Sequence, residues 1–209
     1  MAIGPTVRRL FGKYEPQIAA LYRSIYIDLD DYIGQIERWV KNPKRILEIG
    51  AGEGAVTERL AEAFPNASIT GIDITDNVGR LYAGPIGKVT FEQKTVQEVA
   101  ASQPGSYDFV ILSDVLHHVP TNLRPEILSS ARQCLSKDGL MIFKDWGRAR
   151  TPIHLMCLAS DRYLTGDDVS FLTASEAERL LAHHFGASAI ADRTTIAPWS
   201  NNYAFLING

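Results

Sequence analysis

The sequence predicts an α/β fold in which a mostly parallel β-sheet is covered by helices on both faces. Short apolar runs typical of buried strands alternate with segments whose apolar residues recur every three or four positions, as in amphipathic helices. Near the end, two strand-like segments, 187–196 and 203–207, are separated only by a short turn rich in proline and asparagine. Strands joined in this way cannot be parallel, so we expect one antiparallel strand at or near an edge of the sheet.

The length of 209 residues suits one domain with an insertion and is too short for two independent cores. We therefore expect a single domain over residues 1–209. Its expected parts are an N-terminal helical cap (1–43), a ligand-binding core (44–146), an insertion (147–173), and a terminal helix and hairpin (174–209).

The individual elements follow from the apolar pattern in chain order. Residues 15–40 have apolar side chains three or four apart, which indicates one or two amphipathic helices, and the aspartates at 28, 30 and 31 mark a break if there are two. The later elements are expected as strands at 45–49, 67–74, 89–93, 107–112 and 140–143 and helices at 55–64, 123–135 and 175–185.

Composition and charge disfavour several classes of protein. The 24 acidic residues outnumber the 21 lysines and arginines, which disfavours a protein that mainly binds nucleic acid. Cys134 and Cys157 have no CxxC or Cys/His spacing, so we expect buried reduced thiols, no disulfide framework and no metal site. No run of about 18 apolar residues occurs, so integral membrane association is not expected. A cytoplasmic location is the resulting expectation.

A glycine-rich turn follows the strand at 45–49. Gly50, Gly52 and Gly54 let a nucleotide-like ligand approach backbone N–H groups at the start of the next helix. With Ala55, the turn also satisfies the dinucleotide pattern G-x-G-x-x-G/A. Glu48 argues against a dinucleotide, because its carboxylate would repel a pyrophosphate but would favour a cationic ligand group such as an ammonium near a sulfonium.

Asp73 ends the following strand, 19 positions after Gly54. A carboxylate at that place can accept both hydroxyls of an adenosine ribose. The simpler alternatives are a plain βα turn for the glycines and a helix cap or solvated loop for Asp73. The glycine turn and the acidic residue together favour the ligand-binding interpretation.

The segment Leu47-Glu-Ile-Gly-Ala-Gly-Glu-Gly54 resembles the first motif of the class I S-adenosylmethionine-dependent methyltransferases, an apolar-acidic-apolar triplet followed by G-x-G-x-G. Further segments similar to this family follow at 89–96, 107–119 and 135–143, so the resemblance extends from about residue 44 to the end. It implies a Rossmann-like three-layer sandwich with a seven-stranded sheet of order 3-2-1-4-5-7-6, strand 7 antiparallel. It also implies S-adenosylmethionine as the cofactor.

The resemblance further implies which residues bind the cofactor. Asp73 would hold the ribose, Thr95 and Val96 the adenine edge, and the Ser113 carbonyl the methionine ammonium. The family commonly has an acidic residue at the adenine position, where this chain has Lys94 and Thr95. The full expected set is Glu48, Gly50, Ala51, Gly52, Gly54, Asp73, Ile74, Thr95, Val96, Ser113, Asp114 and Val115.

Methyl transfer requires a nucleophile aligned with the methyl group and a group that removes any obstructing proton. His118 is the favoured candidate for acid–base work over His117, since one histidine of such a pair usually packs near the cofactor in the resembling family. Asp145, at the end of a strand, could orient the acceptor or could form a salt bridge with Lys144 or Arg148.

The insertion at 147–173 contains Tyr163 within a polar and aromatic cluster. This composition predicts either a lid with acceptor-binding residues or a surface loop pinned by a salt bridge. The leading functional hypothesis is a methyltransferase for a small-molecule acceptor, with O-, N- and C-methylation all open. The alternatives are a non-catalytic S-adenosylmethionine-binding or scaffold protein and a nicotinamide oxidoreductase, the latter disfavoured by Glu48.

Overall fold

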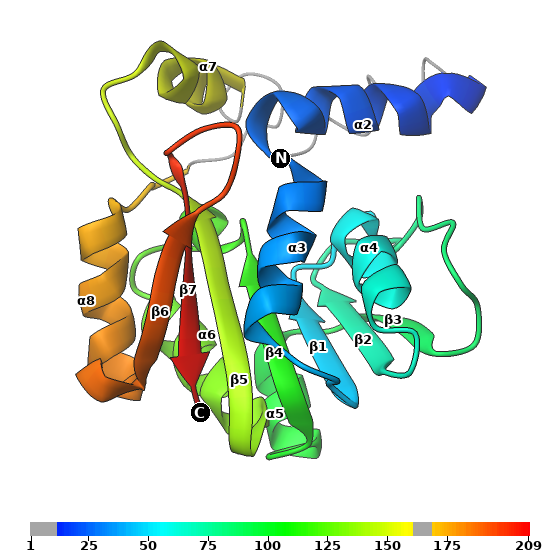
Figure 1. Cartoon of the computed structure of the whole chain (residues 1–209), viewed down its shortest axis with the longest axis vertical. Coiled ribbons are helices and arrows are strands. Elements are labelled where there is room, and N and C mark those ends of the chain that lie inside the picture. Colours follow the sequence, from blue (N-terminus) through cyan, green and yellow to red (C-terminus); the bar gives the residue numbers. More distant parts are fainter. Residues whose placement is uncertain (1–11, 161–168) are drawn as a thin grey trace.

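A single seven-stranded sheet forms the centre of the computed structural model, which describes residues 12–160 and 169–209 (Figure 1). The strand order is β3-β2-β1-β4-β5-β7-β6, and β7 runs antiparallel to both of its neighbours. This confirms the fold and the sheet order that the resemblance implied. The strands are β1 (Arg45–Ile49), β2 (Ser68–Asp73), β3 (Val89–Gln93), β4 (Tyr107–Ser113), β5 (Leu135–Trp146), β6 (Ile190–Thr195) and β7 (Asn202–Asn208).

Helices cover both faces of the sheet and the carboxyl end of its parallel strands. Residues of α3 (Leu29–Trp39) and α4 (Ala55–Ala63) pack on one face. Residues of α5 (Val96–Ser102), α6 (Arg124–Cys134) and α8 (Ala174–Phe185) pack on the other. Helices α2 (Glu15–Tyr26) and α7 (Pro152–Ser160) lie across the carboxyl end, at the top of Figure 1. Three short 3₁₀ turns complete the described elements: η1 (Gly12–Tyr14), η2 (Leu116–His118) and η4 (Ala187–Ala189).

The central strands supply both halves of the core because their side chains alternate between the two faces of the sheet. In β4, Val110 and Leu112 join the cluster under α5, α6 and α8, whereas Phe109 and Ile111 join the cluster under α3 and α4. All four side chains are fully buried. A strand buried on both faces reads as a continuous apolar run, which explains why the sequence located β4 well.

The boundaries of two strands, β5 and β6, differ from the sequence prediction. The predicted strand at 140–143 is part of a longer β5, because Leu135 already pairs with Tyr107 before a register shift. At its other end, β5 continues through Lys144 and Asp145, whose polar side chains are buried. The predicted strand at 187–196 begins with the turn η4 before β6.

The break predicted near residue 28 is confirmed. The Asp28 carboxylate accepts hydrogen bonds from the backbone N–H groups of Asp30 and Asp31, both at 3.0 Å, and so caps α3. This cap satisfies amide groups that the first turn of a helix leaves unpaired. The chain therefore forms two helices over this segment.

The junction between α2 and α3 is fastened to the turn between β6 and β7. Trp199 Nε1 donates to the Ile25 carbonyl at 2.6 Å, and Asn202 Nδ2 donates to the Tyr26 carbonyl at 2.5 Å. The backbone N–H of Asp28 donates to the Ala197 carbonyl at 2.8 Å. These bonds hold the end of α2 over the carboxyl end of the sheet.

Cys134 and Cys157 are buried thiols, and neither takes part in a disulfide. Among the described helices, none combines the length and the apolar composition that crossing a membrane requires.

Candidate active site

A cavity of about 200 Å³ lies at the carboxyl ends of β1, β4 and β5, beneath the end of α2. Parallel α/β sheets bind ligands at this edge. The predicted cofactor residues that line it are Glu48, Gly50, Ala51, Gly52, Ser113 and Asp114. The cavity is also lined by Arg23 and Tyr26 at the end of α2, which we call the roof. Further lining residues are His117, Lys144, Trp146 and Asn202.

The three glycines of the turn have different structural roles. Each has a positive φ, which favours glycine. A Cβ atom at Gly50 would lie 2.1 Å from Val115 Cγ2, and one at Gly54 would lie 3.0 Å from Tyr82 Cβ. At Gly52, the nearest atom would be Asp73 Oδ2 at 3.9 Å. Gly50 and Gly54 therefore serve internal packing, whereas Gly52 leaves space that a ligand could occupy.

Glu48 is a buried carboxyl group directly before this turn. It is 3% exposed, and its Oε2 accepts a hydrogen bond from Thr57 Oγ1 at 2.5 Å. No described lysine, arginine or histidine forms a salt bridge with it. Burial raises the pKa of Glu48 to about 8, and the nearby charge of Asp73 adds to the effect, while the Thr57 hydrogen bond opposes it. The ionised form of Glu48 would thus be stabilised by a cationic ligand.

Asp73 is held beside the turn by two backbone N–H groups. Its Oδ2 accepts from Gly52 N–H at 2.8 Å, and its Oδ1 accepts from Thr75 N–H at 3.0 Å. Each carboxylate oxygen has a further lone pair for another donor. The next residue, Ile74, is 73% exposed. The edge of the sheet thus presents an oriented carboxylate beside an exposed apolar side chain.

The Thr95 side chain has a different role from the predicted adenine contact. Its hydroxyl donates to Glu98 Oε2 at 2.7 Å and accepts from Glu98 N–H at 3.3 Å, which forms a capping box at the start of α5. The Val96 side chain is buried in the core, and neither residue is part of the cavity lining. The T-x-x-E pattern at 95–98 was a visible signal for this cap.

Buried Lys144 and partly exposed Asp114 form an ion pair near the ends of β5 and β4. Lys144 Nζ donates to both carboxylate oxygens of Asp114, at 2.6 and 2.8 Å, and the lysine side chain is only 2% exposed. Burial opposes ionisation of Asp114, but the charge of Lys144, the nearby His117 and the hydrogen bond from Lys144 together lower the pKa of this carboxyl. The ion pair fixes the segment after β4, where Asp114 has a positive φ of 56°.

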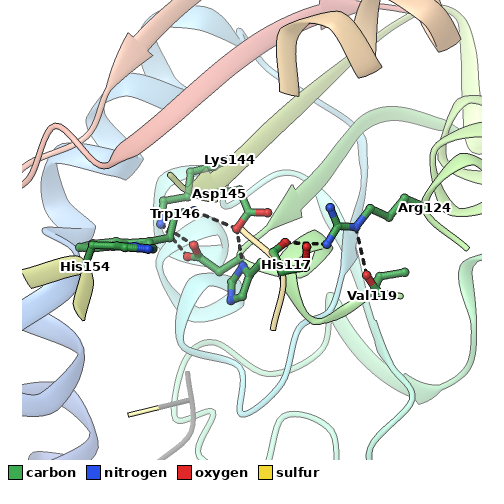
Figure 2. Close-up of polar contacts among 9 residues, drawn as sticks. His117, Val119, Arg124, Lys144, Asp145, Trp146 and His154 are labelled. Carbon is green, nitrogen blue, oxygen red and sulfur yellow. Dashed lines mark hydrogen bonds and ion pairs between the residues drawn. The ribbon is translucent and has the colours of Figure 1, made fainter. Parts of the chain in front are cut away.

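A second pair, between the buried residues His117 and Asp145, is shown in Figure 2. His117 Nδ1 is hydrogen-bonded to Asp145 Oδ1, which also accepts from the Trp146 N–H at 2.8 Å. Each of the two residues is 1% exposed. A carboxylate beside Nδ1 favours the tautomer with the proton on Nδ1, so Nε2 is left as a hydrogen-bond acceptor. Nε2 has no hydrogen-bond partner among the described residues.

This arrangement changes the assignment of the histidines and of Asp145. Burial and the neighbouring His117 lower the pKa of His118 to about 3, so His118 would hold an abstracted proton poorly. Asp145 forms neither of the predicted salt bridges, because Lys144 pairs with Asp114 and Arg148 pairs with Glu176 at 2.8 Å. The geometry therefore favours His117 over His118 for acid–base chemistry.

The insertion is described up to residue 160 and from residue 169, so Tyr163 lies outside the described residues. Helix α7 packs through Ile153 and Cys157 against a cluster that includes Tyr26 and Trp146. His154, on the same helix, accepts a hydrogen bond at 3.1 Å from Trp146 Nε1 through its Nδ1 atom (Figure 2). The described part of the insertion thus supports one wall of the cavity through Trp146.

Asp114, His117 and Asp145 offer ligand atoms within 4.8 Å of one another, as a metal site would require. Their charges, however, are already matched within the protein. Lys144 occupies both oxygens of Asp114, and His117 Nδ1 is paired with Asp145. A cation would have to displace the lysine, so the donor set fits a metal ion poorly.

Comparison with known proteins gives consistent matches. A family model described as a methyltransferase domain matches residues 23–191. The chain is 30% identical over 162 residues to a ubiquinone biosynthesis O-methyltransferase of Nitrosospira multiformis, covering 71% of this chain and 65% of the relative. It is 38% identical over 104 residues to an enzyme of the same name from Bordetella parapertussis, covering 48% of this chain and 41% of the relative. The chain thus spans about two fifths to two thirds of these relatives' lengths.

Solved structures show the same fold at lower sequence identity. The apo form of the S-adenosylmethionine-dependent methyltransferase SibL matches with a TM-score of 0.73 and 16% identity, covering 98% of this chain and 59% of that one. An S-adenosylmethionine-dependent methyltransferase from Mesorhizobium loti matches with a TM-score of 0.65 and 16% identity, covering 87% of this chain and all of that one.

Proposed function

The chain belongs to the methyltransferase domain family, and from this premise we propose that it transfers a methyl group from S-adenosylmethionine to an oxygen atom of a small molecule. The relatives named O-methyltransferases support oxygen as the methylated atom. The observation that carries the proposal is Glu48, a buried carboxyl group with no salt-bridge partner among the described residues, which lines a cavity beside an open glycine turn.

The residues at this edge fit the chemical groups of the cofactor. Glu48 can compensate positive charge from the ammonium and sulfonium groups. Asp73 retains lone pairs for a ribose diol, and the space at Gly52 admits a ligand close to the backbone. When bound, S-adenosylmethionine supplies a methyl group on a positively charged sulfur, which keeps the bonding electrons when the methyl group leaves.

The acceptor must lose a proton when its hydroxyl oxygen gains a methyl group. In our proposal, His117 Nε2 takes this proton, because Asp145 holds the ring with the other nitrogen protonated and stabilises the imidazolium that forms. Trp146 N–H in turn fixes the Asp145 carboxylate. These contacts prepare one buried nitrogen base in a residue that lines the cavity.

Calorimetry and product analysis test the proposed function. We expect S-adenosylmethionine and S-adenosylhomocysteine to bind and NAD⁺ to give no binding heat. Incubation with a mixture of small hydroxyl compounds should then yield O-methylated products, detected by mass spectrometry. Binding without any transfer across oxygen, nitrogen and carbon acceptors would instead favour the non-catalytic alternative, and binding of NAD⁺ alone would overturn the assignment of the donor site.

A further inference from the structure

Buried polar atoms without partners identify a second feature of the cavity. In the described part of the chain, five buried side-chain atoms lack a hydrogen-bond partner: Gln97 Oε1, His117 Nε2, His184 Nε2, Asn202 Oδ1 and Tyr203 OH. Among these five residues, only His117 and Asn202 line the cavity. Because an unpaired buried polar atom is unfavourable, this coincidence suggests that both atoms await groups of a ligand.

The orientation of the Asn202 amide is set by the protein. Asn202 is fully buried at the start of β7, and its Nδ2 donates to the Tyr26 carbonyl at 2.5 Å. A carbonyl can only accept a hydrogen bond, so the amide nitrogen must face Tyr26. The unpartnered atom is therefore the amide oxygen, which is an acceptor.

Both unpartnered atoms are hydrogen-bond acceptors, so a ligand must supply a donor to each. The aromatic residue Trp146 connects the two positions. Trp146 pairs with Asn202 across β5 and β7 and directly follows Asp145, the partner of His117. Its ring meets the Tyr26 ring edge to face, with centroids 5.7 Å apart. Trp146 and Tyr26 both line the cavity, so apolar aromatic surface accompanies the two acceptors.

We propose that Asn202 determines acceptor specificity by binding, through Oδ1, a second hydrogen-bond donor of the molecule whose first hydroxyl faces His117. The acceptor class is a flat, largely apolar molecule with two donor groups, of which one is the methylated hydroxyl. Aromatic walls favour a planar body, and a molecule with only one donor would leave one buried oxygen unpaired. This inference rests on the proposed function, since it places the acceptor beside the same base.

Pairs of matched phenols test the proposed role of Asn202. They are titrated into the complex of the protein with S-adenosylhomocysteine. Each probe carries one hydroxyl and, at one further ring position, either a hydroxyl, which can donate, or a methoxy group, which only accepts. For at least one ring position, the hydroxyl probe should bind the unchanged protein about fivefold more tightly or better, as expected for one net hydrogen bond. Titration calorimetry measures both affinities.

Three variants separate specificity from structural effects. Asn202→Ala should abolish the preference, and Asn202→Leu serves the same purpose with a similar volume if the alanine variant does not fold. Asn202→Asp keeps an acceptor oxygen but loses the donor to Tyr26, so it should retain the preference even if its melting temperature falls. Tyr203→Phe removes a neighbouring unpartnered atom outside the cavity lining and should leave the preference unchanged.

The possible outcomes distinguish this inference from the proposed function. Failure of S-adenosylhomocysteine to bind the unchanged protein would overturn the proposed function. With normal cofactor binding, the specificity role is overturned by equal affinities within every probe pair, by no measurable binding of any hydroxyl probe, or by a preference that survives removal of the Asn202 oxygen.

Discussion

The two halves of the cavity are built by different means. On the donor side, contacts join residues close in sequence: Glu48 meets Thr57 nine positions later, and Gly52 meets Asp73 21 positions later. On the acceptor side, buried side chains form hydrogen bonds over longer separations: 28 positions from His117 to Asp145, and 176 positions from the Asn202 amide to the Tyr26 carbonyl. The donor side is thus a local motif, whereas the acceptor side exists only once the sheet has assembled.

The sharpest test of this division is the His117–Asp145 pair. In the proposed mechanism His117 accepts the proton, so His117→Ala should lower kcat by about 10²- to 10⁴-fold, the usual contribution of a positioned base. Donor affinity measured by calorimetry should not change. His118→Gln is the matched control and should have a small effect, since a group with a pKa of about 3 does not hold the proton. Equal losses in both variants would contradict the assignment.

Substitutions of Gly50 and Gly52 should separate the packing role of the glycine turn from its role in cofactor binding. Gly50→Ala combines a positive φ with a Cβ contact of 2.1 Å, so we expect it to lower the free energy of unfolding by about 2–4 kcal/mol. Gly52→Ala shares the positive φ, which costs about 1–2 kcal/mol, but its Cβ meets no protein atom closer than 3.9 Å. It should therefore destabilise the fold less than Gly50→Ala and should weaken the binding of S-adenosylmethionine. Urea unfolding and calorimetry measure the two effects. Unchanged cofactor affinity in a folded Gly52→Ala variant would refute the donor site.

Asp73→Ala should weaken the binding of S-adenosylmethionine by about 1.5–3 kcal/mol, the range for hydrogen bonds to a charged group. Asp73→Asn retains one oxygen that can accept from the Gly52 N–H and should weaken binding less. A 2′-deoxy analogue separates ribose recognition from support of the turn. It should bind the alanine variant about as well as the parent cofactor does, and a persisting difference would show that Asp73 does not contact the diol.

Donor binding should also depend on pH. Burial raises the pKa of Glu48 to about 8, so below that pH the carboxyl group is protonated in the protein without ligand. A cationic ligand favours the ionised carboxylate, and its binding must therefore release the Glu48 proton. Affinity should therefore rise with pH between about 6 and 8, by at most about tenfold per unit, and then level off. Calorimetry in buffers with different ionisation heats detects the proton. A slope unchanged in Glu48→Gln would assign the effect to another group.

The raised pKa of Glu48 also predicts how the stability of the protein without ligand depends on pH. Here the direction is opposite, because the free energy of unfolding falls as the pH rises. An unfolded glutamate ionises near an ordinary pKa of about 4.3, whereas folded Glu48 keeps its proton to about pH 8. Its contribution to the free energy of unfolding is fully present below pH 4.3 and is lost as the pH rises to 8. Comparing chemical unfolding of the unchanged protein and Glu48→Gln across this range should show the loss only in the former.

The sequence predicted those features that depend on neighbouring residues. Strand and helix periodicity located the elements, and the glycine spacing located the turn in which Gly52 meets Asp73. The pairing of Lys144 with Asp114 requires the register of β4 against β5, which no local pattern contains. For the same reason, the sequence favoured His118, because the position of Asp145 beside His117 follows only from the assembled sheet.

Local contacts bear on the expected roles of two groups of residues. Thr95 is predicted to contact adenine, and Glu98 stands three positions later and completes a capping box with it. Lys144 and Asp145 continue β5 beyond the predicted strand at 140–143, and each has a partner, Asp114 for Lys144 and His117 for Asp145. Both cases show that a polar residue near a site also forms hydrogen bonds or ion pairs within the protein.

The bonds that fasten α2 and α3 to the β6–β7 turn also constrain the order in which the cavity can form. Synthesis proceeds from the N-terminus, so the glycine turn and Asp73 leave the ribosome well before the partners of the roof at Ala197, Trp199 and Asn202. A nascent chain that ends before these residues lacks both the fastening of its first helices and the Asn202 oxygen. Closure of the roof and completion of the acceptor side therefore coincide, because both depend on residues 197–202.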